Sequence, residues 1–516
     1  MPRTVEASDG SSADGCPSTE GVNVSRRRLF AGLALGTFMA ALDQTVVATA
    51  LPRVTAELGG LTSYTWLAIA YLLTATAFTP LYGRLSDHFG RRVPYLSALA
   101  IFVIGSAAAT GARTMGQLIG ARGCQGLGAA GLLTLAVAVI GDELSPRDRA
   151  RYQGLFGGIF ALASLLGPPV GGLLTDAAGW RWVFAINVPL GVLTGVVVWR
   201  ALPDVRAVSA RVDYWGALLL IGGVSCVLLG VVWGGVEQPW GSPTILLLLG
   251  GGSALLVIFI VYELRVAAPV LPVRLFKDRT FAVSCAAGFC VGACMFVAIY
   301  FVPLFRQVAQ HAGAAQAGRS LLSLTVGLVV GAALSGRIIS RTGRLRPFPV
   351  AGTALMTAGF VMLHGVTAAT SAGVLAVELG VLGLGIGLVM QVLVLAVQNS
   401  VPRETLGAAT SAAGFFRSMG GTLGTSALGA LLINRLLAQV PAASSLTLRP
   451  GPGATATLPE AAIVPFVAAM RDVFLAGAML AGFAFVLTLA LPAHRLADPE
   501  EMASSAHQAP GPKARH

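Results

Sequence analysis

Long apolar segments recur along almost the whole chain, and each is long enough to cross a bilayer. A membrane-spanning helix needs about 20 consecutive apolar residues, and such segments follow one another from Leu29 to Leu491. Charged residues make up 11% of the sequence, whereas a soluble domain carries about 25%. The sequence therefore predicts an all-α membrane protein.

We predict fourteen transmembrane helices, arranged as two six-helix bundles with two inserted helices between them. The apolar segments are residues 28–50, 62–82, 93–111, 115–141, 152–175, 183–202, 213–234, 242–264, 281–305, 317–338, 347–366, 371–399, 407–434 and 466–491. The domain boundaries that follow are a disordered tail at 1–27, a first bundle at 28–202, an inserted pair at 213–264, a second bundle at 281–492 and a disordered tail at 493–516.

A short basic loop occurs twice and supports this division. The stretch Gly83–Arg92 (GRLSDHFGRR) separates the second and third segments, and Gly336–Arg344 (GRIISRTGR) separates the tenth and eleventh. The two loops occupy equivalent places if the seventh and eighth segments are an insertion. A duplicated hinge between membrane-length helices is typical of transporters, which are commonly built from repeats.

Basic residues predict the orientation. If the N-terminus is inside, most of the 35 lysines and arginines fall on cytoplasmic segments, and the positive-inside rule then places both termini in the cytoplasm. The net charge of +12 is explained by basic residues that set the membrane orientation and contact anionic lipid headgroups. Because this charge is not gathered on a soluble domain, nucleic-acid binding has little support. The stretch Ser25–Phe30 resembles a twin-arginine export signal, but an uncleaved first span is favoured because thirteen more spans follow.

No cofactor or metal chemistry is indicated. The six cysteines form no metal-binding or disulfide pattern. The only lysines, Lys277 and Lys513, do not follow a glycine, so a nucleotide-binding Walker loop is excluded. We therefore expect no metal, no cofactor and no enzymatic activity, and transport driven by a gradient.

Several stretches resemble motifs of one family in the right order. Leu42–Pro52 (LDQTVVATALP) is similar to a first-helix motif, and the loop Gly83–Arg92 to the signature between helices two and three. Arg122–Ala130 (RGCQGLGAA) resembles an intramembrane arginine motif, and Gly167–Gly172 (GPPVGG) an antiporter motif. From about residue 28 to 492 the chain thus resembles the major facilitator superfamily, specifically its fourteen-span drug:proton antiporter group.

Asp43 and Arg122 are the predicted proton-coupling residues. An acid within a membrane helix costs about 2.5–3.5 kcal/mol, so it persists only with a partner or a water-filled cavity. Gln125 lies one helical turn from Arg122, on the same face. The alternative is a purely structural polar contact between helices.

Two groups of residues are predicted to control the conformational switch. Asp87 can cap a helix N-terminus or pair with an arginine, and Ser340 replaces it in the second copy of the loop, where any latch is expected to be weaker. In the alternative, the loop arginines only anchor the topology. The predicted switch residues are Gly83, Asp87, Gly90, Arg91, Gly167, Pro168, Gly171 and Gly172.

The predicted substrate-binding residues are Glu378, Gln125, Gln391 and Arg417. Asp43, Arg122 and Glu378 each lie about seven residues from the outer end of a span, which at 1.5 Å per residue is roughly 10 Å deep. We therefore expect them to line one cavity, with the acids favouring a cationic lipophile. Glu378 alone could instead lie at the lipid headgroups.

The resemblance implies a proton-coupled multidrug or antibiotic exporter of the bacterial inner membrane. Its expected partners are a small lipophilic substrate, protons and the lipid bilayer, and a monomer is expected. One alternative is a proton-coupled transporter of a cellular metabolite or lipid. The other is a non-transporting membrane sensor, for which no soluble signalling domain is visible.

Overall fold

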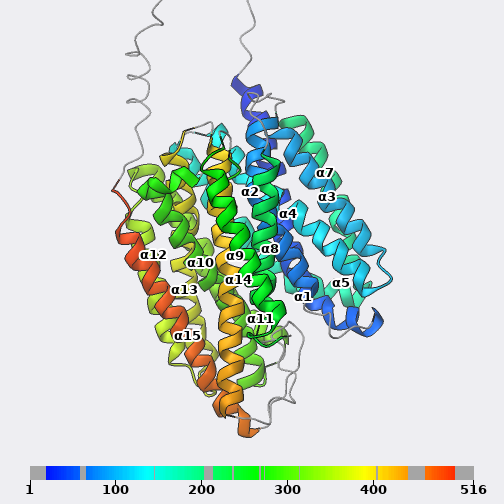
Figure 1. The fold of residues 1–516 in the computed structure, drawn as a ribbon, viewed down its shortest axis with the longest axis vertical. Coiled ribbons are helices and arrows are strands. Elements are labelled where there is room, and N and C mark those ends of the chain that lie inside the picture. Colours follow the sequence, from blue (N-terminus) through cyan, green and yellow to red (C-terminus); the bar gives the residue numbers. More distant parts are fainter. Residues whose placement is uncertain are drawn as a thin grey trace, which may run out of the picture.

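In the computed structural model the chain folds into long helices that run side by side along the longest axis (Figure 1). The structure describes residues 19–58, 66–144, 146–202, 213–234, 238–266, 269–271, 273–312, 314–402, 405–439 and 460–493. Within these ranges there is no β-strand, and a single isolated bridge joins Gly234 to Gln238. The prediction of an all-helical protein is confirmed.

The helices of the first part of the chain are α1 (Thr19–Leu58), α2 (Trp66–Phe89), α3 (Arg92–Thr110), α4 (Met115–Glu143), α5 (Pro146–Ala177), α6 (Arg181–Ala185) and α7 (Asn187–Ala201). Two further helices follow, α8 (Tyr214–Trp233) and α9 (Pro243–Glu263), and then the short 3₁₀ helix η2 (Val273–Lys277). The last part holds α10 (Arg279–Ala309), α11 (Ala314–Thr342), α12 (Pro347–His364), α13 (Ala372–Ser400), α14 (Leu406–Gln439) and α15 (Glu460–Leu489).

Eleven of the described helical stretches are long and apolar enough to cross a membrane. Helices α2, α5 and α14 contain 24, 32 and 34 residues but are not among the eleven. The number of fourteen spans therefore stays a prediction, as do the domain boundaries.

Helix α1 begins earlier than the sequence suggested. Residues 19–27, which were expected to belong to a disordered tail, form its first turns. Extending an existing helix adds one hydrogen bond for each residue fixed, so a helix can run past the end of its apolar segment. Residues 1–18, 440–459 and 494–516 lie outside the described residues, so the expectations for both tails are untested there.

Short polar side chains define several helix starts. Thr114, Ser242, Asp278 and Ser371 each accept a hydrogen bond from the backbone N–H three residues later, which satisfies a donor that the first turn leaves unpaired. The two copies of the basic loop also share a backbone feature. Gly90 and Gly343 both have positive φ, 78° and 65°, a conformation that glycine adopts without strain.

Three large hydrophobic cores organise the helices. One is built by residues of α1, α2, α3, α4, α5 and α7, and another by residues of α10 to α15. The third joins α8 and α9 to α2, α10, α13 and α14. In Figure 1 the blue and cyan helices lie to one side and the yellow to red helices to the other, with α8 and α9 in front of the line between them.

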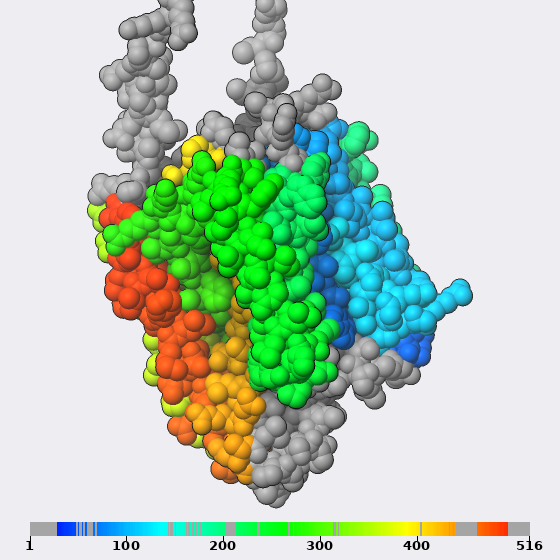
Figure 2. Space-filling view, viewed as in Figure 1, coloured from blue at the N-terminus to red at the C-terminus, as the bar shows by residue number. Residues whose placement is uncertain are grey.

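The outer face of α9 is apolar and open. Leu247 is 75% exposed, and Leu246, Val257 and Ile258 are exposed beside it. This helix forms part of the green front surface in Figure 2. A contiguous apolar surface of this kind is rare on a soluble monomer but is what a lipid-facing helix presents.

Glycines allow the backbones of α11 and α13 to touch. A Cβ atom at Gly383 would clash with the carbonyl oxygen of Leu324, and one at Gly387 with that of Leu328. Such small residues are the usual means by which membrane helices approach closely, because van der Waals packing drives their association.

We therefore expect Gly383→Ala to destabilise the protein, since the added methyl must push α11 away. Overpacking of this kind costs about 1–3 kcal/mol, which would lower the unfolding temperature in detergent. Gly380→Ala is the matched control on the same helix, because a Cβ there meets nothing within 4 Å. Equal unfolding temperatures for the two variants would contradict backbone contact at Gly383.

Candidate functional site

A fully buried polar cluster surrounds Asp43. Arg122 Nη1 lies 2.5 Å from Asp43 Oδ2. Gln125 Nε2 and Asn187 Nδ2 donate to the other oxygen, Oδ1, at 3.1 and 2.8 Å. The four side chains come from α1, α4 and α7, and each is at most 1% exposed. The carboxylate thus has one cation and two amide donors, which is what a charge requires when water is excluded.

The rest of the Arg122 guanidinium is also satisfied. Its Nε donates to the carbonyl of Leu67 at 3.2 Å, and Nη1 donates to Gln125 Oε1 at 2.9 Å. The guanidinium lies over the ring of Tyr71, 4.3 Å from the centroid, where the negative face of the ring attracts a cation. The predicted proximity of Gln125 to Arg122 is confirmed, and so is the expectation that Asp43 has a partner.

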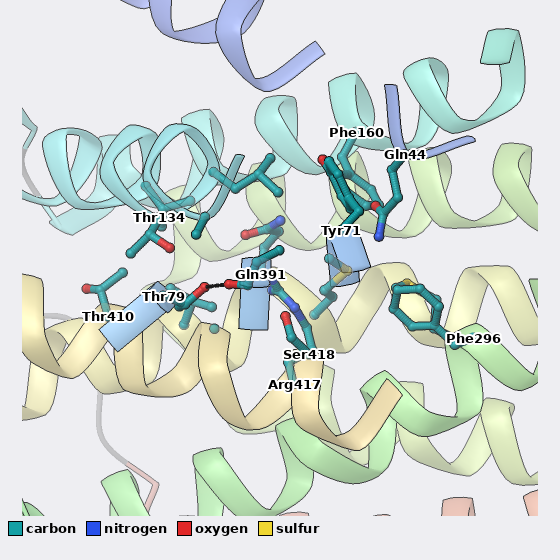
Figure 3. Close-up of a pocket in the computed structure, with 18 residues that line it drawn as sticks. Gln44, Tyr71, Thr79, Thr134, Phe160, Phe296, Gln391, Thr410, Arg417 and Ser418 are labelled. Carbon is teal, nitrogen blue, oxygen red and sulfur yellow. Dashed lines mark hydrogen bonds between the residues drawn. The ribbon is translucent and has the colours of Figure 1, made fainter. Parts of the chain in front are cut away.

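A cavity of about 110 Å³ lies beside this cluster. Figure 3 shows polar and aromatic side chains from α1, α2, α4, α5, α10, α13 and α14 around it. Its lining consists of Gln44, Tyr71, Ala75, Thr79, Ala130, Leu133, Thr134, Val137, Phe160, Met295, Phe296, Met390, Gln391, Val394, Thr410, Gly414, Arg417 and Ser418. A mainly apolar lining with a few polar groups is the usual character of a small-molecule site.

Tyr71 forms the wall between the cavity and the buried cluster. One part of its ring lines the cavity, Arg122 packs against the ring, and its hydroxyl donates to the carbonyl of Ala40 at 3.0 Å. Gln44 follows Asp43 in the chain and lines the same cavity (Figure 3). Asp43 is therefore connected to the cavity through two lining residues.

The predicted substrate-binding residues separate into three places. Gln391 and Arg417 line the cavity, and Gln125 lies in the Asp43 cluster. Glu378 is 5% exposed and lies outside the lining, and its Oε2 has no hydrogen-bond partner among the described residues. Asp43, Arg122 and Glu378 are therefore not among the residues that line this cavity, so the two carboxylates do not favour a cation there.

At the end of the molecule that carries the basic loop, Asp87 joins α2 to α14. Its Oδ2 accepts from the backbone N–H of Ala408 at 2.9 Å, in the first turn of α14, where the helix dipole favours a negative charge. Its Oδ1 is paired with Arg91 Nη1 at 2.9 Å. Burial raises the pKa of the Asp87 carboxyl, while Arg91 and the Ala408 N–H act in the opposite direction.

Neighbouring groups complete this contact. Arg91 Nε donates to Asp142 at 2.6 Å and Nη1 also donates to Ser86. A side chain at Gly83 would clash with Ser411, so the glycine lets α2 approach α14. In the second copy of the loop, Ser340 donates to the carbonyl of Arg337 on its own helix, so it does not form the contact that Asp87 makes.

Helix α5, which carries the predicted switch residues Gly167, Pro168, Gly171 and Gly172, packs against two helices through its glycines. A Cβ at Gly167 would clash with Thr45 of α1, and one at Gly154 would lie 2.6 Å from the Ala332 carbonyl of α11. Gly171 is buried in α5. Pro168 and Gly172 belong to the same helix, but their surroundings lie outside the described residues.

Some members of the site were not predicted. Asn187 and Tyr71 complete the Asp43 cluster, and Asp142 completes the Arg91 contact. Gln153 Nε2 donates to Gln398 Oε1 at 2.6 Å, joining α5 to α13. Asn187 could have been suspected as an amide within an apolar segment, whereas an aromatic residue such as Tyr71 gives no such signal.

No group of three metal-ligating side chains occurs in the described ranges. The site instead offers a buried ion pair, a cavity and a polar contact at one end.

Comparison with known proteins identifies the family of the chain. The Major Facilitator Superfamily profile matches residues 33–425. The chain belongs to the major facilitator superfamily.

Two curated relatives and one solved structure support this membership. The chain is 39% identical to the multidrug transporter protein MdtP of Bacillus subtilis over 416 residues, 80% of this chain and 77% of the relative. It is 32% identical to multidrug resistance protein 3 of the same species over 418 residues, 81% of each. The proton:xylose symporter XylE shares the fold, with a TM-score of 0.64 over 94% of this chain and 99% of that one at 13% identity.

This major facilitator chain is thus a multi-pass membrane transporter whose relatives include multidrug transporters. The superfamily part of the sequence prediction is confirmed. Assignment to the fourteen-span group, and the roles of the individual site residues, stay predictions.

We expect Asp87→Asn to slow transport while leaving substrate affinity nearly unchanged. The amide removes the charge that interacts with Arg91 and with the first turn of α14, an effect of about 0.3–2 kcal/mol. Spin labels at Phe89 and Thr405 would report the distance between the two helix ends. In the variant we expect a longer mean distance or a broader distance distribution.

Ser340→Ala provides the matched control, since its hydroxyl bonds only within α11. Turnover and label distances should match those of the parent protein. A large loss of affinity in Asp87→Asn at normal turnover would refute a switching role for the contact.

Proposed function

We propose that this transporter exports small lipophilic compounds in exchange for protons. The observation that carries the proposal is the Asp43 cluster, a buried carboxylate that shares Tyr71 and Gln44 with the adjacent cavity. A proton carrier must be able to change its charge and must make that change felt at the substrate site. Asp43 has the position that this task requires.

Protonation of Asp43 would undo several contacts at once. The neutral acid no longer attracts Arg122, and one oxygen becomes a donor facing the amide donors of Gln125 and Asn187. Because the cluster links α1, α4 and α7, the helices must then find another arrangement. A coupled change of charge and packing is the kind of two-state element that alternating access needs.

A proton gradient is sufficient as an energy source. One pH unit is worth about 1.4 kcal/mol, and 100 mV is worth about 2.3 kcal/mol for each charge. The sum of these, about 3.7 kcal/mol, corresponds to a concentration ratio of several hundredfold at about 1.4 kcal/mol for each factor of ten.

Export is favoured over import by two observations. The names of the curated relatives describe multidrug transport and resistance, and the α5 stretch Gly167–Gly172 resembles an antiporter motif. We further propose that the protein has fourteen spans, arranged as two six-helix bundles with two inserted helices. Both termini lie in the cytoplasm, and the protein is a monomer in a bacterial inner membrane.

Asp43→Asn should abolish proton-driven transport, because the amide cannot carry a proton through the cycle. The measurement is uptake of a fluorescent lipophile into inverted vesicles with an imposed pH gradient. Asp472→Asn is the control, since Asp472 forms an exposed ion pair with Arg435 and should retain full uptake. Gradient-dependent uptake at parental rates in Asp43→Asn would eliminate the assignment.

Arg122→Lys should also lose most transport, although the positive charge is retained. An ammonium lacks the planar fork and cannot at once reach Asp43, Gln125 and the Leu67 carbonyl while stacking on Tyr71. We expect proton-driven uptake to fall at least about tenfold, as the loss of one charge-assisted hydrogen bond of about 1.5–3 kcal/mol implies. Parental uptake in this variant would mean that Arg122 acts as a simple charge.

A further inference from the structure

Arg417 carries the one formal charge on the cavity lining. It lies in α14, with the start of its side chain against α10, where a Cβ at Gly292 would come within 3.1 Å of Arg417 Cγ. From there the side chain reaches the cavity, beside Ser418 and in the direction of Gln391 (Figure 3). The guanidinium is therefore directed into the space that a substrate would fill.

Among the residues that the structure describes, none forms an ion pair or a hydrogen bond with the Arg417 side chain. Arg122 presents the opposite case, because Asp43, Gln125 and a backbone carbonyl satisfy it. An unpaired charge within a membrane helix is costly and points to a functional site, and the groups that pair best with a guanidinium are anions and strong acceptors.

The lining supports a specific kind of ligand. Its eighteen residues include no carboxylate. A cationic ligand would therefore be repelled by Arg417, and no negative charge on the lining would compensate for that repulsion. Apolar contact is available from Tyr71, Phe160 and Phe296 and from the methionines Met295 and Met390. Methionine and aromatic side chains adapt to apolar bodies of varied shape.

We propose that the cavity takes a lipophilic organic anion, an apolar ring system bearing one carboxylate, and that Arg417 recognises the carboxylate. A guanidinium binds a carboxylate through two parallel hydrogen bonds, while the aromatic and methionine side chains hold the ring. This inference rests on the proposed export function and specifies its substrate class.

The test compares three probes that share one ring system. These are 1-naphthaleneacetate, 1-naphthaleneacetamide and 2-(1-naphthyl)ethylammonium, which are anionic, neutral and cationic at pH 7.5. Equilibrium binding to the purified full-length protein in nanodiscs should be tightest for the acetate. A charge-assisted hydrogen bond makes a difference of about tenfold to a hundredfold in affinity, and the ammonium should bind least.

Variants at Arg417 separate recognition from folding. Arg417→Gln should lose the preference for the acetate while binding the acetamide within about twofold of the parent, and that retained binding reports an intact cavity. Arg417→Lys should retain part of the preference, since it keeps the charge but not the fork. Arg435→Gln removes a charge from the same helix, outside the cavity, and should leave all three affinities unchanged.

Two outcomes would overturn the inference. One is equal affinity of the parent protein for the acetate and the acetamide. The other is an unchanged preference in Arg417→Gln. Failure of the export proposal is a separate result, because it would appear as absence of proton-driven flux of any of the three probes in proteoliposomes, whatever their binding order.

A transport measurement adds an independent readout. Exporting the anion moves one more charge in each cycle than exporting the neutral acetamide, whatever the number of protons. An inside-negative potential set with potassium and valinomycin should therefore speed export of the acetate more than that of the acetamide. Equal responses to the potential would contradict transport of the ionised acid.

Discussion

The ion pair between Asp43 and Arg122 is the interaction on which the first half of the molecule depends. Neither charge can be solvated at this depth, so each needs the other and both need the surrounding donors and acceptors. The close packing of α2 and α4 makes this geometry possible, since a Cβ at Gly126 would clash with the Tyr71 carbonyl. Removing either charge would leave its partner buried and unpaired, which is strongly destabilising.

The Asp43–Arg122 pair lies next to the cavity, and further polar contacts join helices at the basic-loop end. Tyr71 lies between the pair and the cavity. At the basic-loop end, polar contacts join helices through Asp87 with Ala408 and Gln153 with Gln398. These contacts join helices far apart in the chain, and each consists of few hydrogen bonds. Since a hydrogen bond contributes only about 0.5–1.5 kcal/mol net, each of these contacts is individually weak.

Local motifs predicted part of the site well, because spacing along one helix fixes which residues share a face. Gln125 one turn from Arg122 is such a case, and Asp87 as a helix cap is another. Depth along the span did not identify Glu378 as a residue outside the lining of this cavity, for a physical reason. Depth gives the position of a residue along the membrane normal, but a helix turns about 100° with each residue, so residues at one depth can face different spaces. Tyr71 and Asp142 depend on tertiary packing and had no local signature, whereas Asn187 had only the weak one of an amide within an apolar segment.

The two intramembrane arginines of the site show how the sequence alone can mislead about charge. Both read as basic residues in glycine-rich helices, yet Arg122 is neutralised within the protein and Arg417 faces the cavity without a counter-charge. The charge that matters for a ligand is the one left unpaired on the cavity wall. Among the described lining residues that charge is the positive one of Arg417. Of the acids that suggested a cationic substrate, Asp43 is paired with Arg122 and Glu378 is not part of the lining. The proposed preference for an anion thus rests on how the helices are rotated, which composition does not record.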